Sequence, residues 1–252
     1  MPRRFEIRKD LVLDATPEQV WDAVATGPGI TSWFMPHEVE PGEGGTIRLA
    51  VEGFTVDSTI TAWEPPHRLA VRGPTAPDGT FMAFEYLVEG RDGGSAVLRF
   101  VHSGEVGDGW GDEYEDQTTA GWDMYLHTLG EYLRRFRGRP VTYVTAQAPP
   151  RSAGAAGWAV LAAALGLGDD VRDGDAVHLT PDGLPPIDGV ADWVRRGPVA
   201  NFLGIVTEDA MYRFHGRPDA VAVGHHIFVP GIDPKDAQRT WQRWLDRVYE
   251  GG

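Results

Sequence analysis

A long amphipathic stretch, residues 116–137, gives the clearest structural signal in the sequence and determines what the rest of the chain must supply. Its large apolar residues recur at helical spacing: Trp122, Tyr125, Leu126, Leu129, Tyr132, Leu133 and Phe136. At about 100° per residue they form one stripe along a helix. Acidic residues begin the stretch, arginines end it, and Gly138 follows as a stop signal. A stripe that carries several aromatic rings requires a broad apolar partner.

The chain before this helix alternates between apolar and polar residues, as the strands of an antiparallel sheet with one buried face do. The alternating segments are residues 5–13, 46–52, 54–63, 69–71, 82–88 and 98–102. Thr16, Pro17 and Gln19 form a capping signal for a helix after the first strand. Gly27-Pro28-Gly29 is expected to end that helix, and a short second helix is expected over residues 30–34. We therefore predict a long helix packed against a curved antiparallel sheet.

This half contains several short motifs, which are Ala15–Trp21, Trp33-Phe34, Glu40-Pro41-Gly42 with Gly44-Gly45, Trp63–Leu69 and Gly121-Trp122. Their residues and order resemble those of the SRPBCC or START-like superfamily. Within the superfamily the chain resembles bacterial proteins similar to the C-terminal domain of the activator of heat-shock-protein-90 ATPase. The resemblance covers about residues 5–137 and implies a helix-grip fold, in which a curved sheet wraps around a long C-terminal helix.

Residues 139–252 repeat this order of elements in a shorter form. A strand over 141–144, a helix over 157–167 and strands over 174–179, 211–214 and 220–229 precede a capped helix that begins near Asp233. That last helix again carries an apolar stripe, consisting of Ala237, Trp241, Trp244, Leu245 and Val248. The predicted fold class is α+β, a tandem pair of helix-grip domains over 1–138 and 139–252 with a divergent second copy. The alternative is an unrelated α+β domain with a terminal amphipathic helix.

Composition excludes several classes of function. The chain has 252 residues, 42% of them hydrophobic, which suffices for one large domain or two of ordinary size. It has no apolar run of about 18 residues, and its N-terminus lacks an apolar signal core, so a cytoplasmic location without a membrane partner is expected. The absence of cysteine excludes disulfides and thiolate chemistry. A net charge of −14 disfavours nucleic acid as a partner.

The common cofactor and metal motifs are also missing. The sequence has no HxxxH, HExxH or EF-hand spacing, no GxSxG serine, and no phosphate-binding or dinucleotide-binding glycine pattern. His225 and His226 are adjacent on a predicted strand, so their side chains are expected on opposite faces rather than on one ion. We expect neither a metal nor a cofactor.

The family resemblance implies a cavity between the long helix and the sheet, which in this superfamily often holds hydrophobic small molecules. The candidate ligand-binding residues are Ser58, Phe84, Tyr86, Phe100, His102, Trp110, Thr118, Trp122, Tyr125, Leu126 and Leu129. The alternative for the large rings among them is that they fill the interior themselves. Trp110 lies in a glycine-rich, acidic segment that is either a solvated loop or a lid over the end of the sheet.

Three polar residues, His102, Tyr86 and Glu115, are candidates for acid–base catalysis. His102 beside a carboxylate would suit a general base near neutral pH, whereas a solvated His102 at the end of its strand would have no such role.

Three hypotheses about function follow. The first is a non-enzymatic protein that holds a hydrophobic or aromatic small molecule in the first domain, with a structural or regulatory second domain. The second is an enzyme of the polyketide cyclase or dehydratase type, which requires two of the catalytic candidates to meet within the cavity. The third, suggested by the family name, is a co-chaperone that activates a heat-shock ATPase. The sequence lacks a recognisable counterpart of the separate N-terminal domain of the eukaryotic activators.

Overall fold

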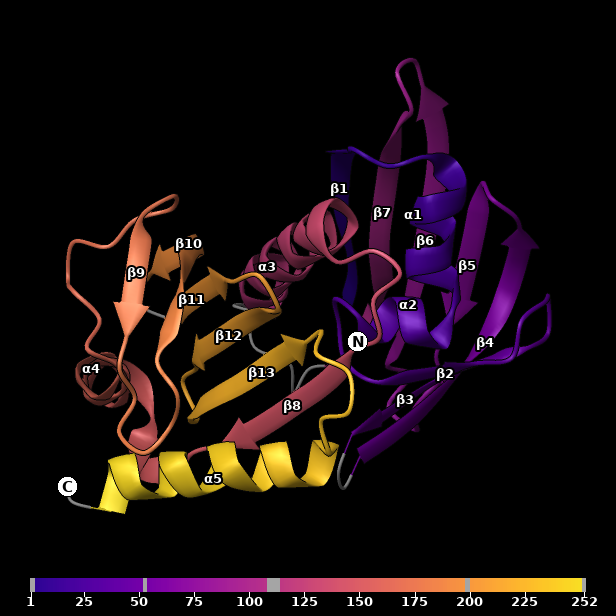
Figure 1. Ribbon diagram of the computed structural model, residues 1–252. Coiled ribbons are helices and arrows are strands. Elements are labelled where there is room, and N and C mark those ends of the chain that lie inside the picture. Colours follow the sequence, from indigo (N-terminus) through magenta and orange to yellow (C-terminus); the bar gives the residue numbers. More distant parts are fainter. Residues whose placement is uncertain (1–2, 52–53, 108–113, 198–199, 251–252) are drawn as a thin grey trace. The chain divides into compact units, whose positions relative to one another are not determined.

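The computed structural model describes residues 3–51, 54–107, 114–197 and 200–250 (Figure 1). The chain consists of two compact units, Met1–Gly138 and Arg139–Gly252, which we call the first and the second domain. Each domain contains one antiparallel sheet and ends in a long helix. None of the helices in the described ranges is long and apolar enough to cross a membrane.

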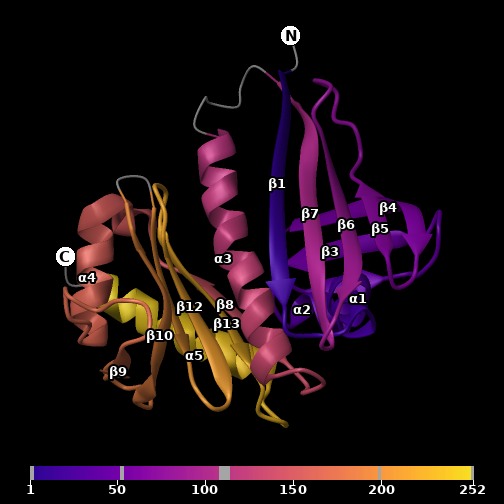
Figure 2. The same ribbon diagram turned by 90° about the horizontal axis from the view of Figure 1, so that it is seen from above.

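The first domain has seven strands and three helices in its described part. The strands are β1 (Arg3–Leu13), β2 (His37–Val39), β3 (Thr46–Val51), β4 (Phe54–Glu64), β5 (Arg68–Arg72), β6 (Phe81–Arg91) and β7 (Ser95–Val106), and the helices are α1 (Pro17–Ala25), α2 (Gly27–Thr31) and α3 (Tyr114–Arg135). The sheet order is β1-β7-β6-β5-β4-β3-β2, so the first strand pairs with the last and the others follow in reverse. Figure 2 shows α3 running along this sheet.

The stripe predicted on α3 forms much of the core of the first domain. Trp122, Leu126, Leu129, Tyr132, Leu133 and Phe136 are all at least 93% buried. Opposite them, Phe5, Ile7 and Leu13 occupy the inward positions of β1, as the alternation in the sequence predicts. A salt bridge of 2.6 Å between Lys9 Nζ and Asp123 Oδ1 also joins β1 to α3. The helix is thus held to the sheet mainly by apolar packing.

The start of α1 follows the predicted capping pattern. Thr16 Oγ1 accepts from the backbone N–H of Gln19 at 3.4 Å, and Gln19 Oε1 accepts from the backbone N–H of Thr16 at 2.9 Å. The prediction for α2 was wrong in its bounds, because Gly27-Pro28-Gly29 forms the start of this helix rather than a break before it. The cause is Thr26, whose hydroxyl oxygen accepts from the N–H of Gly29 at 3.0 Å and caps α2 directly after α1 ends.

The second domain has the same connectivity with one strand fewer. Its strands are β8 (Thr142–Gln147), β9 (Ala176–Leu179), β10 (Ile187–Arg196), β11 (Asn201–Val206), β12 (Ala210–Gly216) and β13 (Val221–Ile227), and its helices are η1 (Pro150–Ser152), α4 (Gly154–Leu165) and α5 (Pro234–Glu250). The sheet order β8-β13-β12-β11-β10-β9 again pairs the first strand with the last and runs back through the others. The chain is therefore a tandem pair of α+β helix-grip domains, as predicted.

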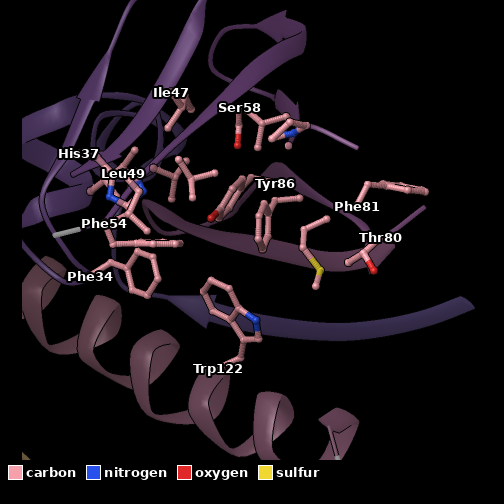
Figure 3. Close-up of a pocket in the computed structure, with 18 of the residues that line it drawn as sticks. Phe34, His37, Ile47, Leu49, Phe54, Ser58, Thr80, Phe81, Tyr86 and Trp122 are labelled. Carbon is pink, nitrogen blue, oxygen red and sulfur yellow. The ribbon is translucent and has the colours of Figure 1, made fainter. Parts of the chain in front are cut away.

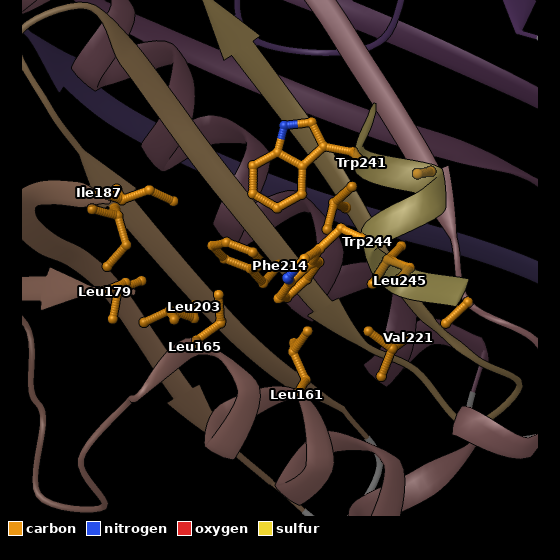
Figure 4. Packing of buried hydrophobic residues seen from close by; sticks show 14 of the residues in the cluster. Leu161, Leu165, Leu179, Ile187, Leu203, Phe214, Val221, Trp241, Trp244 and Leu245 are labelled. Carbon is orange, nitrogen blue, oxygen red and sulfur yellow. The ribbon is translucent and has the colours of Figure 1, made fainter. Parts of the chain in front are cut away.

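Indole rings occupy the space between α5 and the sheet of the second domain. Trp241 and Trp244 lie 5.5 Å apart edge to face, and Trp241 also contacts Phe214 at 6.0 Å. Figure 4 shows these side chains meeting residues from α4 and from the strands. The cluster includes Leu161, Leu165, Leu179, Ile187, Leu203, Val221 and Leu245. This part of the second domain is a packed core.

The capping box predicts a specific stability effect. Replacing Thr16 by Ala removes the acceptor for the N–H of Gln19, and we expect a loss of about 1 kcal/mol in the free energy of unfolding of the first domain. Urea denaturation followed by circular dichroism measures this change. Thr16→Ser keeps the hydroxyl and should retain most of the stability, so an equal loss in both variants would contradict the role given to the cap.

Candidate functional site

A cavity of about 480 Å³ lies inside the first domain, between α3 and the inner face of the sheet (Figure 3). Apolar and aromatic side chains form most of its wall. The lining residues are Val24, Ile30, Phe34, His37, Ile47, Leu49, Phe54, Val56, Ser58, Val71, Gly73, Pro74, Ala76, Thr80, Phe81, Met82, Phe84, Tyr86 and Trp122. Figure 3 shows Trp122 rising from α3 opposite Tyr86 and Ser58 of the sheet.

Strand pleating explains why these side chains meet. Alternate residues of a strand point to the same face, so Phe54, Val56 and Ser58 of β4 line the cavity together. On β6 the same rule brings in Met82, Phe84 and Tyr86. The short α2, the segment after it and the start of β2 supply another part of the wall through Ile30, Phe34 and His37.

The predicted ligand-binding residues fall into three groups. Ser58, Phe84, Tyr86 and Trp122 line the cavity. Phe100, Leu126 and Leu129 are at least 98% buried in the core, outside the lining, and Tyr125 packs edge-on against Phe34 with ring centroids 4.4 Å apart. Thr118 is placed on α3, also away from the lining, whereas Trp110 lies outside the described residues.

His102 lies in the core next to the cavity, where Trp122 holds it. Trp122 Nε1 donates a hydrogen bond to His102 Nδ1 at 2.9 Å, and Phe84 stacks on the imidazole with centroids 4.4 Å apart. Because Nδ1 accepts, the proton of the neutral ring sits on Nε2, which is buried and has no hydrogen-bond partner in the structure. Burial lowers the pKa of His102 to about 4. His102 is thus buried and uncharged at neutral pH, and no carboxylate of the described residues forms a hydrogen bond or ion pair with it.

The three catalytic candidates do not form a hydrogen-bonded pair. Tyr86 faces the cavity, and burial raises the pKa of its phenol, so the hydroxyl stays protonated. Glu115 is placed in the first turn of α3 and is not a lining residue. Within the described ranges no hydrogen bond joins His102, Tyr86 or Glu115 to another of the three. A proton relay between them is therefore not assembled in this structure.

The sequence analysis did not name most of the lining residues as candidates, and Phe34 and His37 are the aromatic ones among them that contact Trp122 or one another. Phe34 stacks on Trp122 at 5.4 Å and on His37 at 5.5 Å, so the three rings form a continuous wall. His37 opens β2, which has only three residues and is too short to show an alternating pattern. The Trp33-Phe34 motif could have drawn attention to this wall, but its two rings have different places: Phe34 lines the cavity, whereas Trp33 is buried outside the lining and donates to the Ala23 carbonyl at 2.9 Å.

The adjacent histidines of the second domain are part of its packing. His225 lies 4.3 Å from Trp241, ring to ring, and its Nδ1 accepts from the backbone N–H of Arg213 at 3.0 Å. Burial holds the pKa of His225 well below its usual value. His226 instead contacts Tyr143, with centroids 5.1 Å apart. The two rings have different neighbours, in keeping with their alternation along β13.

The sequence of the first domain matches a known family over almost its whole length. Residues 14–134 match the family described as Activator of Hsp90 ATPase homolog 1-like protein. The first domain belongs to this family. The cavity thus lies in an activator-like domain, the name we use for it below, and every lining residue falls within the matched range. No curated protein is significantly similar in sequence to the chain.

Several solved structures have a similar course of the chain at low sequence identity. The di-domain ARO/CYC BexL from the BE-7585A biosynthetic pathway is 14% identical, with 98% of this chain and 99% of that chain covered and a TM-score of 0.47. DynU16 from the dynemicin biosynthetic locus is 15% identical, with 96% and 95% covered and a TM-score of 0.45. CalU16 from Micromonospora echinospora is 24% identical, with 52% and 76% covered and a TM-score of 0.40. At this level of similarity a function does not transfer from one protein to another.

The buried imidazole predicts a pH effect on the stability of the activator-like domain. The unfolded chain protonates His102 near its ordinary pKa of 6.5, but the folded domain does so only near pH 4. Between these values the unfolded state binds more protons, so stability decreases as the pH falls, by up to about 1.4 kcal/mol per pH unit.

In His102→Asn the amide oxygen can still accept from Trp122, but the titrating group is gone. We expect a smaller decrease of unfolding free energy between pH 6.5 and 4.5 than in the unsubstituted protein, measured by urea denaturation at each pH. The same pH dependence in both proteins would show that His102 is not buried as a neutral ring.

Proposed function

We propose that the activator-like domain binds an apolar or aromatic small molecule in the cavity between α3 and the sheet. The observation that carries this proposal is the open volume of about 480 Å³ that is lined mainly by aromatic and aliphatic side chains. This volume is within the range of about 300–1,000 Å³ that small-molecule sites occupy. It argues against the alternative considered from the sequence, an interior filled by its own rings.

The physical driving force for binding is the burial of apolar surface. A ligand that removes its own apolar surface and that of the wall from water gains roughly 25 cal/mol per Å². It also supplies the dispersion contacts that the lining atoms lack on their open side. The wall is composed of rings that already pack on one another, such as Phe34 on Trp122 and Phe84 on His102, so binding requires little reordering of side chains.

The arrangement favours binding over catalysis. The titratable side chains that face the cavity, His37 and Tyr86, are both held in their neutral forms by burial, which lowers the pKa of His37 and raises that of Tyr86. Neutral groups can orient a ligand through hydrogen bonds. We infer a carrier, sensor or sequestering role, with the packed second domain as a structural or regulatory partner in the same chain.

Filling the cavity provides the test. Val56 lies on β4 and faces the cavity, so Val56→Phe places a ring in the volume that a ligand needs. We expect protein purified gently from its own host to carry a bound small molecule in native mass spectrometry, and Val56→Phe to carry at least about tenfold less of it.

Val12→Phe is the matched control, because Val12 is 67% exposed on β1 and does not line the cavity. It should retain the bound mass. The proposal fails if Val56→Phe keeps the ligand as well as Val12→Phe does. It also fails if the unsubstituted protein is empty and binds none of a set of aromatic and acyl compounds.

A further inference from the structure

One histidine of the cavity wall has a fixed tautomer. The ring of His37 is bonded through Nδ1 to the backbone oxygen of Met35 at 2.8 Å. A carbonyl oxygen can only accept, so Nδ1 carries the proton. Burial lowers the pKa of His37, although the bond to Met35 partly opposes this, and the ring is neutral at pH 7. His37 Nε2 is consequently left as a hydrogen-bond acceptor.

The position of His37 is also fixed. Its backbone N–H donates to Thr31 Oγ1 at 3.1 Å, and Thr31 Oγ1 in turn donates to the Gly27 carbonyl at 2.7 Å. Its ring stacks on Phe34. The acceptor therefore stands at a defined place in the cavity wall without a partner for Nε2 among the described residues. A rigid acceptor of this kind costs little entropy when a ligand donates to it.

The other polar groups of the wall are uncharged hydroxyls. Tyr86 and Ser58 have no hydrogen-bond partner for their hydroxyls within the described ranges, and both can donate or accept. Thr80 Oγ1 accepts from the backbone N–H of Gly107 at 3.0 Å. Among the described residues that line the cavity there is no Asp, Glu, Lys or Arg. A charged ligand would lose its hydration there without gaining an ion pair.

We propose that the ligand is an uncharged aromatic molecule whose hydroxyl group, phenolic or alcoholic, donates a hydrogen bond to His37 Nε2. This inference rests on the proposed function and specifies the chemistry of its ligand. His37 is then the residue that determines specificity for a hydrogen-bond donor, and the aromatic wall contributes affinity without distinguishing a hydroxyl from its ether.

Three naphthalene probes separate these contributions in isothermal titration calorimetry with the full chain. The probe 2-naphthol has the donor, 2-methoxynaphthalene replaces it by an ether, and 2-naphthoate is charged at neutral pH. We expect 2-naphthol to bind roughly tenfold more tightly than the ether, since the ether cannot donate a hydrogen bond to His37 Nε2. Binding of 2-naphthoate should be weaker than that of both neutral probes.

Substitutions at His37 test whether the preference for 2-naphthol over 2-methoxynaphthalene depends on Nε2. His37→Asn keeps a donor for the Met35 carbonyl but has no atom at the place of Nε2, so the two neutral probes should bind equally. His37→Gln can place its amide oxygen near that position and should restore part of the preference. Circular dichroism confirms that each variant is folded, and His37→Gln serves as the test if His37→Asn does not fold.

His67→Asn is the matched control. His67 Nδ1 also bonds a backbone oxygen, that of Val88 at 3.2 Å, but His67 does not line the cavity. This variant should keep the full preference for 2-naphthol.

The inference is overturned if the unsubstituted protein binds the ether or 2-naphthoate as tightly as 2-naphthol, or if His37→Asn retains the preference. In those cases the cavity still binds an aromatic molecule and the proposed function stands. If no probe binds the unsubstituted protein at all, the inference is overturned, and the native mass spectrometry of the unsubstituted protein and Val56→Phe decides separately on the proposed function.

Discussion

The packing of Trp122 is the interaction on which the interior of the activator-like domain depends. Its indole lies against Phe34 on one side and Phe100 on another, with centroids 5.4 and 4.4 Å away. Its N–H is satisfied by His102, which is why an imidazole can be buried in the middle of an apolar sheet face. This side chain contributes to the packing of α3 on the sheet and is the residue of α3 that lines the cavity among those described. A residue that both stabilises the core and contacts the open space couples the stability of the domain to the contents of the cavity.

The two domains share one connectivity but have different interiors. Both pair their first strand with their last and close with a long helix. In the second domain, Trp241 and Trp244 of α5 pack with Phe214 and the leucines of α4 into a continuous cluster. In the activator-like domain, the corresponding space keeps a volume of about 480 Å³ open. The order of strands and helices is shared, but the two interiors differ in their side chains, and the described part of the second domain has one strand fewer.

The fold could be predicted from the sequence more completely than the residues of the candidate site. The apolar stripe of α3, the alternation along β1 and the capping box at Thr16 are local patterns, and the structure contains all three. The repeat of the element order made the tandem arrangement predictable as well. The site residues were harder to predict from the sequence, because alternation identifies the face of a strand on which a residue lies but not its distance from a cavity. Phe84 and Phe100 share a face, yet only Phe84 reaches the open volume.

The place of His37 in the cavity wall could not be predicted from any local pattern in the sequence. Its role depends on a bond to Met35, on the stacking of Phe34 and on a strand of three residues, all of which exist only in the folded domain. Similarly, nothing in the sequence around His102 indicates that its partner is an indole 20 residues further along the chain. The identity of the ligand, the role of Trp110 and a heat-shock partner remain predictions.

The pairing of first and last strands has a consequence for synthesis on the ribosome. In the activator-like domain Arg3 pairs with Val106, and in the second domain Thr142 pairs with Ile227. A chain that emerges from its N-terminus therefore exposes the edge of β1 until nearly the whole domain has been made. Such long-range pairing slows folding and leaves an unpaired strand open to association with other chains. In each domain the closing helix follows the last strand directly, so sheet completion and burial of the apolar face can occur almost together, near the end of that domain's translation.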